Sequence, residues 1–232
     1  MHNLIELPPW DRLLKRIVWE QLGEIEGKRI LDFGSGEGIT ANHFANKNLV
    51  VAVEPSEEML NNRWEDYQYK QLIGDVSKLS ELEDHSFDLI VCHNVLEYID
   101  DKEQIINELY RLLKTGGTLS IVKHNRAGRV MQMAVILDNM EKANELVDGN
   151  DIESAQFGAI MYYEDEQIAK WNKGLKLIDT FGIRTFWDLQ QNQEKHGTEE
   201  WQMRMMQLEM RVSKIEEYRK IAFFHHLIFI KE

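Results

Sequence analysis

The 232-residue chain has a single cysteine, Cys92, and no long apolar run. One thiol excludes an intrachain disulfide and a zinc site built from cysteines. Cys92 lies in an apolar stretch, so we expect it to pack in the core as a buried free thiol. No segment approaches the roughly 20 apolar residues of a membrane span, and residues 1–14 lack the apolar core of a signal peptide. The sequence therefore predicts a cytoplasmic protein that does not enter a membrane.

Positive charge is also scarce. Lys and Arg total 27 against 40 Asp and Glu, which gives a formal net charge of -13. This balance disfavours broad, non-specific attraction to nucleic acid, because phosphate binding depends on clustered Lys and Arg, but it leaves room for a local basic pocket. The long polar segment at 195–220 mixes both signs evenly, which predicts a solvated helix face and not a phosphate-binding stripe.

The chain also lacks low-complexity linkers and internal repeats. Its 232 residues are many for one small domain and few for two, so we expect a single α/β domain over 1–232 with an insertion. Strand and helix patterns alternate, which predicts a parallel sheet with helices on both faces and the order 3-2-1-4-5. After an N-terminal helix that ends before Gly23, we expect strands at 29–34, 49–54, 69–74, 87–93 and 118–124 and helices at 37–46, 56–66 and 101–114.

Beyond the fifth strand the pattern changes. We expect Gly116-Gly117 to supply the left-handed turn that ends the helix at 101–114. Residues 126–163 then form a helical insertion over the carboxyl edge of the sheet, where ligands bind in this topology. Its Met-rich part either lines an adaptable acceptor pocket or packs the insertion onto the domain. We expect a further helix at 164–173 and strands at 175–186 and 222–231.

The segment Ile30 to Thr40 carries glycine at alternate positions after an apolar run that contains an acid. Asp32 lies near the end of that run, and Gly34 and Gly36 let the backbone turn with positive φ and approach a ligand closely. The first amides of the following helix would face that ligand. Glu54 closes the next apolar run about 20 residues after the first glycine, where an acid can hold both ribose hydroxyls. An adenosine-containing cofactor is indicated.

The glycine spacing distinguishes between adenosine cofactors. Nicotinamide and flavin sites favour G-x-G-x-x-G with a pyrophosphate at the helix N-terminus, whereas Ile39 stands where the third glycine would be. The Asp32 carboxylate would repel a pyrophosphate but attract the ammonium of a methionine moiety. S-adenosylmethionine is therefore the better fit. The alternatives are an NAD-dependent oxidoreductase and a non-catalytic protein that binds S-adenosylmethionine.

Five segments, in order, resemble the motifs of class I, Rossmann-like methyltransferases, and the resemblance runs from about residue 28 to the C-terminus. They are Ile30 to Gly38, Val53 to Ser56, Gly74 to Val76, Phe87 to Tyr98 and Leu109 to Leu119. The resemblance implies a seven-stranded sheet of order 3-2-1-4-5-7-6, with S-adenosylmethionine bound along one edge. The cofactor-binding residues that it implies are Asp32, Gly34, Gly36, Glu54, Asp75, Val76 and His93.

The last third of the chain resembles one subfamily. Gly182 to Asp188 and His124-Asn125 are similar to the bacterial tRNA 5-carboxymethoxyuridine methyltransferases, which methylate the carboxylate on a wobble-position uridine. Lys123-His124 departs from that family, which tends to be aromatic there. The expected acceptor is either this carboxylate in a tRNA anticodon or an unidentified small molecule.

Methyl transfer from a sulfonium requires few catalytic side chains. The enzyme must hold the acceptor atom in line behind the methyl carbon, and such positioning can supply on the order of 7–11 kcal/mol. A hydroxyl or amine acceptor also needs a base, for which His93, His124, Glu97 and Tyr98 are candidates. A carboxylate, with a pKa of about 4, arrives ionised and needs only cationic or amide partners.

Cationic side chains gather near the expected acceptor edge. Arg184 is either a fork donor for a substrate carboxylate or a surface ion-pair partner, and Asn125 lies where acceptors enter. The expected catalytic residues are thus His93, Asn125 and Arg184. We expect no metal site, because 93–98 and 122–126 lack an aspartate cluster. The sequence leaves the oligomeric state open. The cationic residues near this edge are Lys123, Arg126, Arg129 and Arg184.

Overall fold

A computed structural model describes residues 1–154 and 158–232. Its main feature is a seven-stranded sheet in which the first five strands are parallel and β9 runs antiparallel to both of its neighbours. Numbered along the chain, the seven strands lie in the order 3-2-1-4-5-7-6, so the predicted fold class is confirmed. In spatial order the strands are β3 (Lys70–Ile73), β2 (Leu49–Glu54), β1 (Arg29–Phe33), β4 (Phe87–His93), β5 (Leu113–His124), β9 (Phe224–Lys231) and β8 (Leu175–Ile183).

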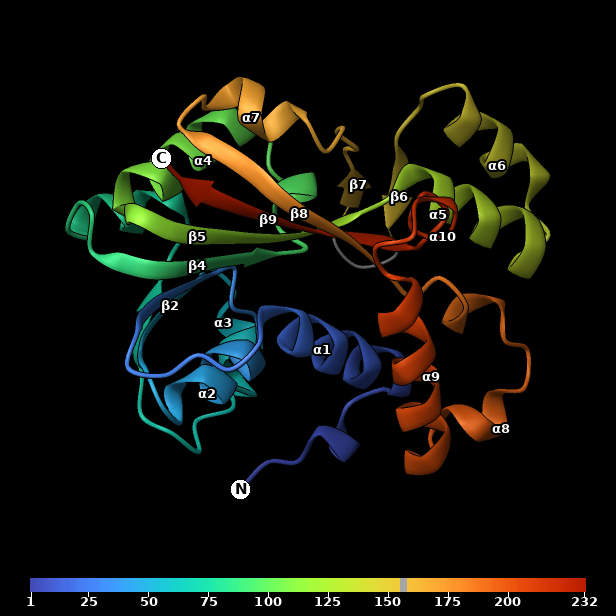
Figure 1. The fold of residues 1–232 in the computed structure, drawn as a ribbon, viewed down its shortest axis with the longest axis horizontal. Coiled ribbons are helices and arrows are strands. Elements are labelled where there is room, and N and C mark those ends of the chain that lie inside the picture. Colours follow the sequence, from blue (N-terminus) through green and yellow to red (C-terminus); the bar gives the residue numbers. More distant parts are fainter. Residues whose placement is uncertain (155–157) are drawn as a thin grey trace.

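Helices cover both faces of this sheet (Figure 1). On one face lie α4 (Lys102–Leu112) and α7 (Gln167–Trp171), and on the other lie α1 (Pro9–Leu22) and α2 (Ile39–Ala45). The helix α9 (Glu199–Val212) packs along α1 through Trp201 and three methionines. The central strands are therefore mostly apolar, as expected of parallel strands covered on both faces, and Asp32 on β1 is a buried exception. The remaining short helices outside the insertion are η1 (Leu4–Glu6), α3 (Glu57–Asn61), η2 (Val76–Glu81), η3 (Leu96–Tyr98), η5 (Trp187–Leu189), α8 (Gln193–His196) and α10 (Glu216–Arg219).

The helix predicted at 56–66 ends early, at Asn61. The backbone N–H of Trp64 donates to the carbonyl of Glu37 at 2.8 Å, and the Tyr69 hydroxyl donates to the carbonyl of Trp64 at 2.6 Å. These bonds draw the chain toward the glycine turn, so the helical bonds cannot continue.

The prediction that Gly116-Gly117 ends the fourth helix is wrong. The helix ends at Leu112, and Leu113 is already extended because it pairs with Phe87 on β4. Its carbonyl accepts a hydrogen bond from Lys231 Nζ at 2.8 Å. Gly116, with a φ of 75°, instead lies in the irregular first residues of β5.

The insertion after β5 begins with helices and continues into two antiparallel strands. It contains α5 (Arg126–Met131), the π-helix η4 (Gln132–Ile136), α6 (Met140–Val147) and the paired strands β6 (Ile152–Ser154) and β7 (Gly158–Ile160). Part of the predicted insertion, 155–157, lies outside the described residues. Met133 packs with Leu146 and Ile152 in a small core of its own. Met133 thus packs the insertion, whereas Ile136 lines the cavity described below and Leu137 and Met140 are exposed, so each of the two predictions holds for part of the stretch.

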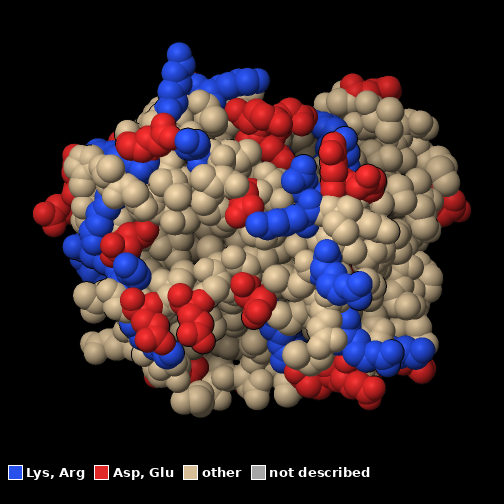
Figure 2. Space-filling view, viewed as in Figure 1, with Lys and Arg blue, Asp and Glu red and all other residues tan. Residues whose placement is uncertain are grey.

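The surface in the view of Figure 2 mixes both signs of charge. Lys and Arg lie interspersed with Asp and Glu and form no continuous basic track across this face. Among the described residues, no helix is long and apolar enough to cross a membrane.

Candidate active site

The predicted glycine turn joins the end of β1 to α2. Gly34 has a φ of 76°, and a Cβ there would stand 2.3 Å from Val95, so the turn packs directly against the loop after β4. Gly36 has a φ of 54°, and a Cβ there would meet no atom within 4 Å. The backbone at Gly36 therefore borders open space at the carboxyl edge of the sheet, which suits the close approach of a ligand.

Asp32 is buried on β1, and its Oδ2 has no hydrogen-bond partner within the described chain. Burial raises the pKa of this carboxyl to about 7, although Lys15 nearby and a hydrogen bond from the backbone of Ala41 oppose the shift. A buried carboxylate oxygen without a donor costs free energy until a cationic or donor group reaches it. Asp32 therefore fits the ammonium of the S-adenosylmethionine methionine moiety.

Glu54, at the end of β2, differs from Asp32 because both of its oxygens have partners. Its Oε2 accepts the N–H of Gly36 at 2.8 Å, and its Oε1 accepts the N–H of Ser56 at 2.9 Å. Each carboxylate oxygen can accept a second hydrogen bond. Glu54 therefore braces the glycine turn and keeps acceptor capacity for two ribose hydroxyls.

Asp75 and Val76 follow β3 along the same edge. Asp75 is exposed, and its Oδ1 accepts the N–H of Ser77 at 2.9 Å, which begins η2. Val76 packs against the main core. The predicted cofactor residues thus lie at the ends of adjacent strands, and their contacts with the cofactor stay a prediction.

The His93 side chain packs on the sheet against side chains of β5 and β9. Its Nε2 lies 2.7 Å from Ser120 Oγ, which lies 2.7 Å from Nε2 of the buried His226. Burial, with His226 close by, holds the pKa of His93 well below its usual range. A side chain engaged in this way is poorly placed as a general base, so its predicted cofactor contact rests on the backbone.

A cavity of about 590 Å³ opens beside the loop after β4. Its walls come from the start of α1, the insertion, the segment after β8 and the start of β9, which converge at one end of the sheet in Figure 1. Asn94, which directly follows His93 at the carboxyl end of β4, is part of the cavity lining. The lining includes Trp10, Tyr98, His124, Arg129, Gln132, Arg184, Trp187, Asp188, Phe223 and Phe224. Aromatic rings and guanidinium groups thus line the same cavity.

Arg184 lines this cavity, yet its guanidinium is already engaged. Its Nε donates to Asp188 Oδ2 at 3.1 Å, and its Nη2 bonds the other carboxylate oxygen. β8 ends at Ile183 and not at 186 as predicted, since Arg184 has a left-handed φ of 60°. The next three backbone N–H groups donate to the buried carboxylate of Glu209, at 2.8, 2.9 and 3.3 Å. Of the two roles predicted for Arg184, the geometry shows the ion pair, with Asp188 as its partner.

The Asn125 side chain holds two backbone segments together. Its Nδ2 donates to the carbonyls of Lys220 at 2.9 Å and Ala222 at 2.7 Å, and its backbone N–H donates to the carbonyl of Phe223. Asn125 is absent from the cavity lining. The arrangement suits a positioning residue, and the predicted catalytic role of Asn125 has no geometric support.

Two histidines, His124 and His196, line the cavity, and His124 is the one predicted as a candidate base. Burial, together with Arg129, Arg184 and Lys123, lowers its pKa to about 3. Its Nε2 lies 3.3 Å from the Tyr98 hydroxyl. Glu97 lies behind it, 1% exposed, where burial raises its pKa to about 7. His124 is thus a neutral and weakly basic imidazole at pH 7.

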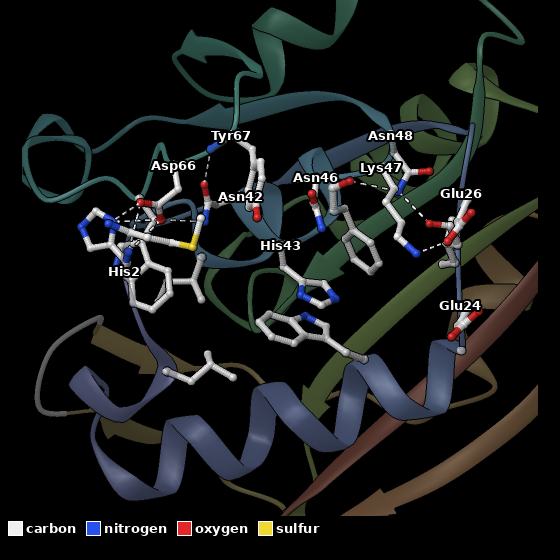
Figure 3. Close-up of a pocket in the computed structure, with 18 residues that line it drawn as sticks. His2, Glu24, Glu26, Asn42, His43, Asn46, Lys47, Asn48, Asp66 and Tyr67 are labelled. Carbon is white, nitrogen blue, oxygen red and sulfur yellow. Dashed lines mark hydrogen bonds and ion pairs between the residues drawn. The ribbon is translucent and has the colours of Figure 1, made fainter.

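A second cavity, of about 410 Å³, lies between α1 and α2 (Figure 3). Its polar side chains are mostly paired with one another: Asp66 with His2, and Lys47 with Glu26. His43 stacks on Trp19 with ring centroids 3.6 Å apart. This cavity contains none of the predicted site residues, so it is no part of the candidate active site. No cluster of three or more His, Cys, Asp or Glu suited to a metal occurs among the described residues.

Comparisons with known proteins agree with these features. Residues 31–121 match the family described as a methyltransferase domain. The chain is 24% identical, over 93% of its length and 87% of the relative's, to a tRNA 5-carboxymethoxyuridine methyltransferase of Escherichia coli strain K12. It is 28% identical, over 52% of its length and 54% of the relative's, to a ubiquinone biosynthesis O-methyltransferase of Paracidovorax citrulli.

Solved structures share the fold. An S-adenosylmethionine dependent methyltransferase from Mesorhizobium loti has a TM-score of 0.61 at 17% identity, over 99% of this chain and all of that one. Phosphoethanolamine N-methyltransferase 2 of Haemonchus contortus, in complex with S-adenosyl-L-methionine, has a TM-score of 0.58 at 17% identity, over 96% of this chain and 52% of that one. The matched family spans the glycine turn, Glu54 and the fourth strand, so residues 31–121 form a methyltransferase domain, and the whole chain shares the fold of solved S-adenosylmethionine-dependent methyltransferases.

Proposed function

We propose that this methyltransferase esterifies a carboxylate, with the carboxymethoxy group of a wobble-position uridine in tRNA as the first choice of acceptor. The observation that carries the proposal is the cavity beside the cofactor edge, where two guanidinium groups lie among aromatic rings. Guanidinium groups bind carboxylates, and aromatic rings stack on an unpaired base. The likeness to the Escherichia coli enzyme over 93% of the chain supports the same acceptor.

The protonation states of the cavity favour an acceptor that arrives ionised. His124 has its pKa lowered to about 3, and His93 turns toward Ser120, so neither is suited to deprotonate a hydroxyl or amine at pH 7. A carboxylate with a pKa of about 4 needs no base. The cofactor supplies an activated methyl group, and the chain's own residues bind and orient the acceptor.

The cofactor assignments rest on strand-end positions. In this proposal Asp32 holds the ammonium and Glu54 the ribose hydroxyls, while Asp75 and Val76 border the adenine. Gly34 and Gly36 bring the backbone close, and His93 contributes its backbone. Residues 126–163 act as a cap over the acceptor within the single domain 1–232. A tRNA acceptor also implies that the enzyme works in the cytoplasm.

The test compares tRNA nucleosides by mass spectrometry. Transfer RNA from a strain that lacks this protein is incubated with the purified enzyme and S-adenosylmethionine. The proposal predicts that 5-carboxymethoxyuridine gains one methyl group as an ester. Unchanged tRNA together with methylation of a compound in a small-molecule extract would favour the other acceptor class, a small molecule.

A further inference from the structure

The two guanidinium groups of the cavity differ in what already binds them. Arg184 is paired with Asp188 through two nitrogens and lies over Phe223 and Phe224, with 4.9 and 5.3 Å to the ring centroids. Its side chain is 7% exposed. A bidentate partner leaves little of its fork for a substrate. Arg184 therefore serves as a neutralised, packed wall of the cavity.

Arg129 lacks such a partner. Its Nη1 bonds the amide oxygen of Gln132, the one hydrogen-bond acceptor it has in the described structure, and its Nε is buried with none. The guanidinium lies 5.6 Å from the centroid of the Phe223 ring. No carboxylate forms an ion pair with it in the described residues, whereas Arg126 on the same helix pairs with Asp151. Arg129 thus carries an uncompensated charge.

The surroundings of Arg129 make this charge costly. Burial lowers the pKa of its guanidinium, and Arg184 nearby acts in the same direction, against Tyr162, Tyr98 and Asp188. A buried charge without a counterion is unfavourable unless a ligand supplies one. The cost is consistent with a group kept for binding an anion.

The fold holds Arg129 in place through the start of α5. Asn125 donates two hydrogen bonds to the segment before β9. Gly128 lies so close to that segment that a Cβ would stand 2.2 Å from the carbonyl oxygen of Ala222. These two residues fix α5 against the backbone at Ala222 and Phe223, so the next residue, Arg129, projects into the cavity. Preorganisation of this kind lowers the cost of binding.

We propose that Arg129 is the residue that binds the carboxylate of the acceptor, oriented by Gln132, while Arg184 and Asp188 form the wall beside it. This inference rests on the proposed carboxylate acceptor. It replaces Arg184 as the fork donor with a residue on the insertion, and it makes α5 the element that selects acidic over neutral acceptors.

The test compares two probes on the full-length protein loaded with S-adenosylhomocysteine: 5-carboxymethoxyuridine and its methyl ester. We expect the unsubstituted protein to bind the acid more tightly than the ester. Arg129→Gln should reduce affinity for the acid by about 10- to 100-fold and leave affinity for the ester nearly unchanged, since a hydrogen bond to a charged group is lost. Arg204→Gln removes an equal charge from an exposed position of α9 and should preserve the preference.

The outcomes separate the two proposals. A preference for the acid that survives Arg129→Gln overturns the assignment of Arg129 and leaves the carboxylate acceptor standing. A protein with no preference for the acid overturns both. A preference lost in Arg129→Gln and kept in Arg204→Gln supports both.

Thermal unfolding of the ligand-free protein distinguishes a binding role of Arg129 from a structural role, because the two roles predict opposite changes in unfolding temperature. Arg129→Gln removes an uncompensated charge, so its unfolding temperature should stay equal or rise. Arg184→Gln leaves Asp188 without its partner, so its unfolding temperature should fall. A large fall for Arg129→Gln would assign that residue to the scaffold and overturn the inference.

Discussion

At the scale of single residues, two carboxyls on neighbouring strands show how similar sequence signals acquire different properties. Asp32 has an oxygen with no donor in the described structure, and burial raises its pKa to about 7. Glu54 has a backbone N–H on each oxygen. The difference arises because Glu54 reaches the amides of Gly36 and Ser56, whereas Oδ2 of the buried Asp32 reaches no donor in the described structure. The two carboxyls therefore lead to separate predictions for cofactor binding.

Glu54→Ala should weaken S-adenosylmethionine binding. The substitution leaves two ribose hydroxyls without an acceptor, and a buried group left unpaired costs about 1–3 kcal/mol, or roughly 5- to 150-fold in affinity. Calorimetric titration measures the change. Glu57→Ala, on the exposed start of α3, is the control and should bind normally. Equal affinity in the two variants would remove Glu54 from the cofactor site.

Asp32 should make cofactor binding depend on pH. Its pKa of about 7 in the free protein means that the carboxylate is formed above neutrality and lost below it. The ammonium of the cofactor attracts only the ionised form, so affinity should fall by up to about tenfold per pH unit below 7. Titrations across this range in Asp32→Asn should be weak and flat. An unsubstituted protein with flat affinity would contradict the assignment.

The same residue has an opposite effect on stability. Its folded pKa of about 7 lies above the ordinary value of 3.8, so the cofactor-free protein loses stability as pH rises through that interval. Asp32→Asn should therefore stabilise the free protein at about pH 8, by on the order of 1–4 kcal/mol. Denaturant unfolding of the unsubstituted protein and Asp32→Asn, with and without cofactor, measures this difference in the free energy of unfolding.

The sequence predicted where the glycine turn and the strand-end acids lie, but not which arginine is paired, for a physical reason. Glycine spacing and strand-end acids are local patterns, and parallel strands bring their carboxyl ends to one edge. Whether an arginine is free depends on partners that folding brings close. Arg184 finds Asp188 across a left-handed turn, and Arg129 finds Gln132 but no carboxylate among the described residues. Neither fact is visible in a pattern of residues.

At the scale of elements, the docking of α5 controls the acceptor cavity. The helix has only six residues, and its position depends on Asn125 and on the glycine contact at Gly128. Short helices draw little stability from their own hydrogen bonds and depend on tertiary contacts. Weaker packing of α5 should therefore reduce acceptor binding and leave cofactor binding unchanged.

Asn125→Ala tests this coupling. Loss of two hydrogen bonds to backbone carbonyls costs about 1–3 kcal/mol, which lets α5 shift and misplaces Arg129. We expect the KM for the acceptor to rise about tenfold or more, with S-adenosylmethionine affinity unchanged. The control, Asn144→Ala, removes a hydrogen bond within α6. A loss of kcat at unchanged KM would instead restore Asn125 to the catalytic group.

Element ends illustrate the limit of sequence reasoning at this scale. Apolar periodicity located the strands and main helices, because burial on both faces imposes it. Their ends depend on distant partners: Lys231 draws the carbonyl of Leu113 into β5, and Glu209 captures the amides after β8. Such contacts join residues far apart in sequence, so the turn at Gly116 and the end of β8 were predicted wrongly.

At the scale of the whole molecule, the predicted cofactor residues follow strand ends on the same edge of the sheet as Asn94 of the cavity. The net charge of -13 and the mixed surface in Figure 2 offer little general attraction for a polyanion. Recognition of tRNA would then depend on the cavity and on a few neighbouring cations. Binding should accordingly discriminate by the modified base more than by the phosphate backbone.

Chelation should leave turnover intact. Neither Asn125 nor Glu97 lines the acceptor cavity, and no cluster of three or more His, Cys, Asp or Glu among the described residues is suited to a metal. Methyl transfer measured in EDTA should equal the rate in magnesium. Activity lost in EDTA and restored by magnesium would show that a metal takes part.

The most direct measurement of the central claim, a methyl ester on a carboxylate, is the alkali lability of the product. The enzyme is given S-adenosylmethionine labelled on the methyl group and tRNA from a strain that lacks the protein, and the recovered tRNA is treated with mild alkali. Hydroxide cleaves an ester at its acyl carbon and releases the methyl group as methanol, whereas a methyl ether or methylamine keeps it. The account predicts that the label leaves as methanol. Label that stays on the nucleoside would contradict it.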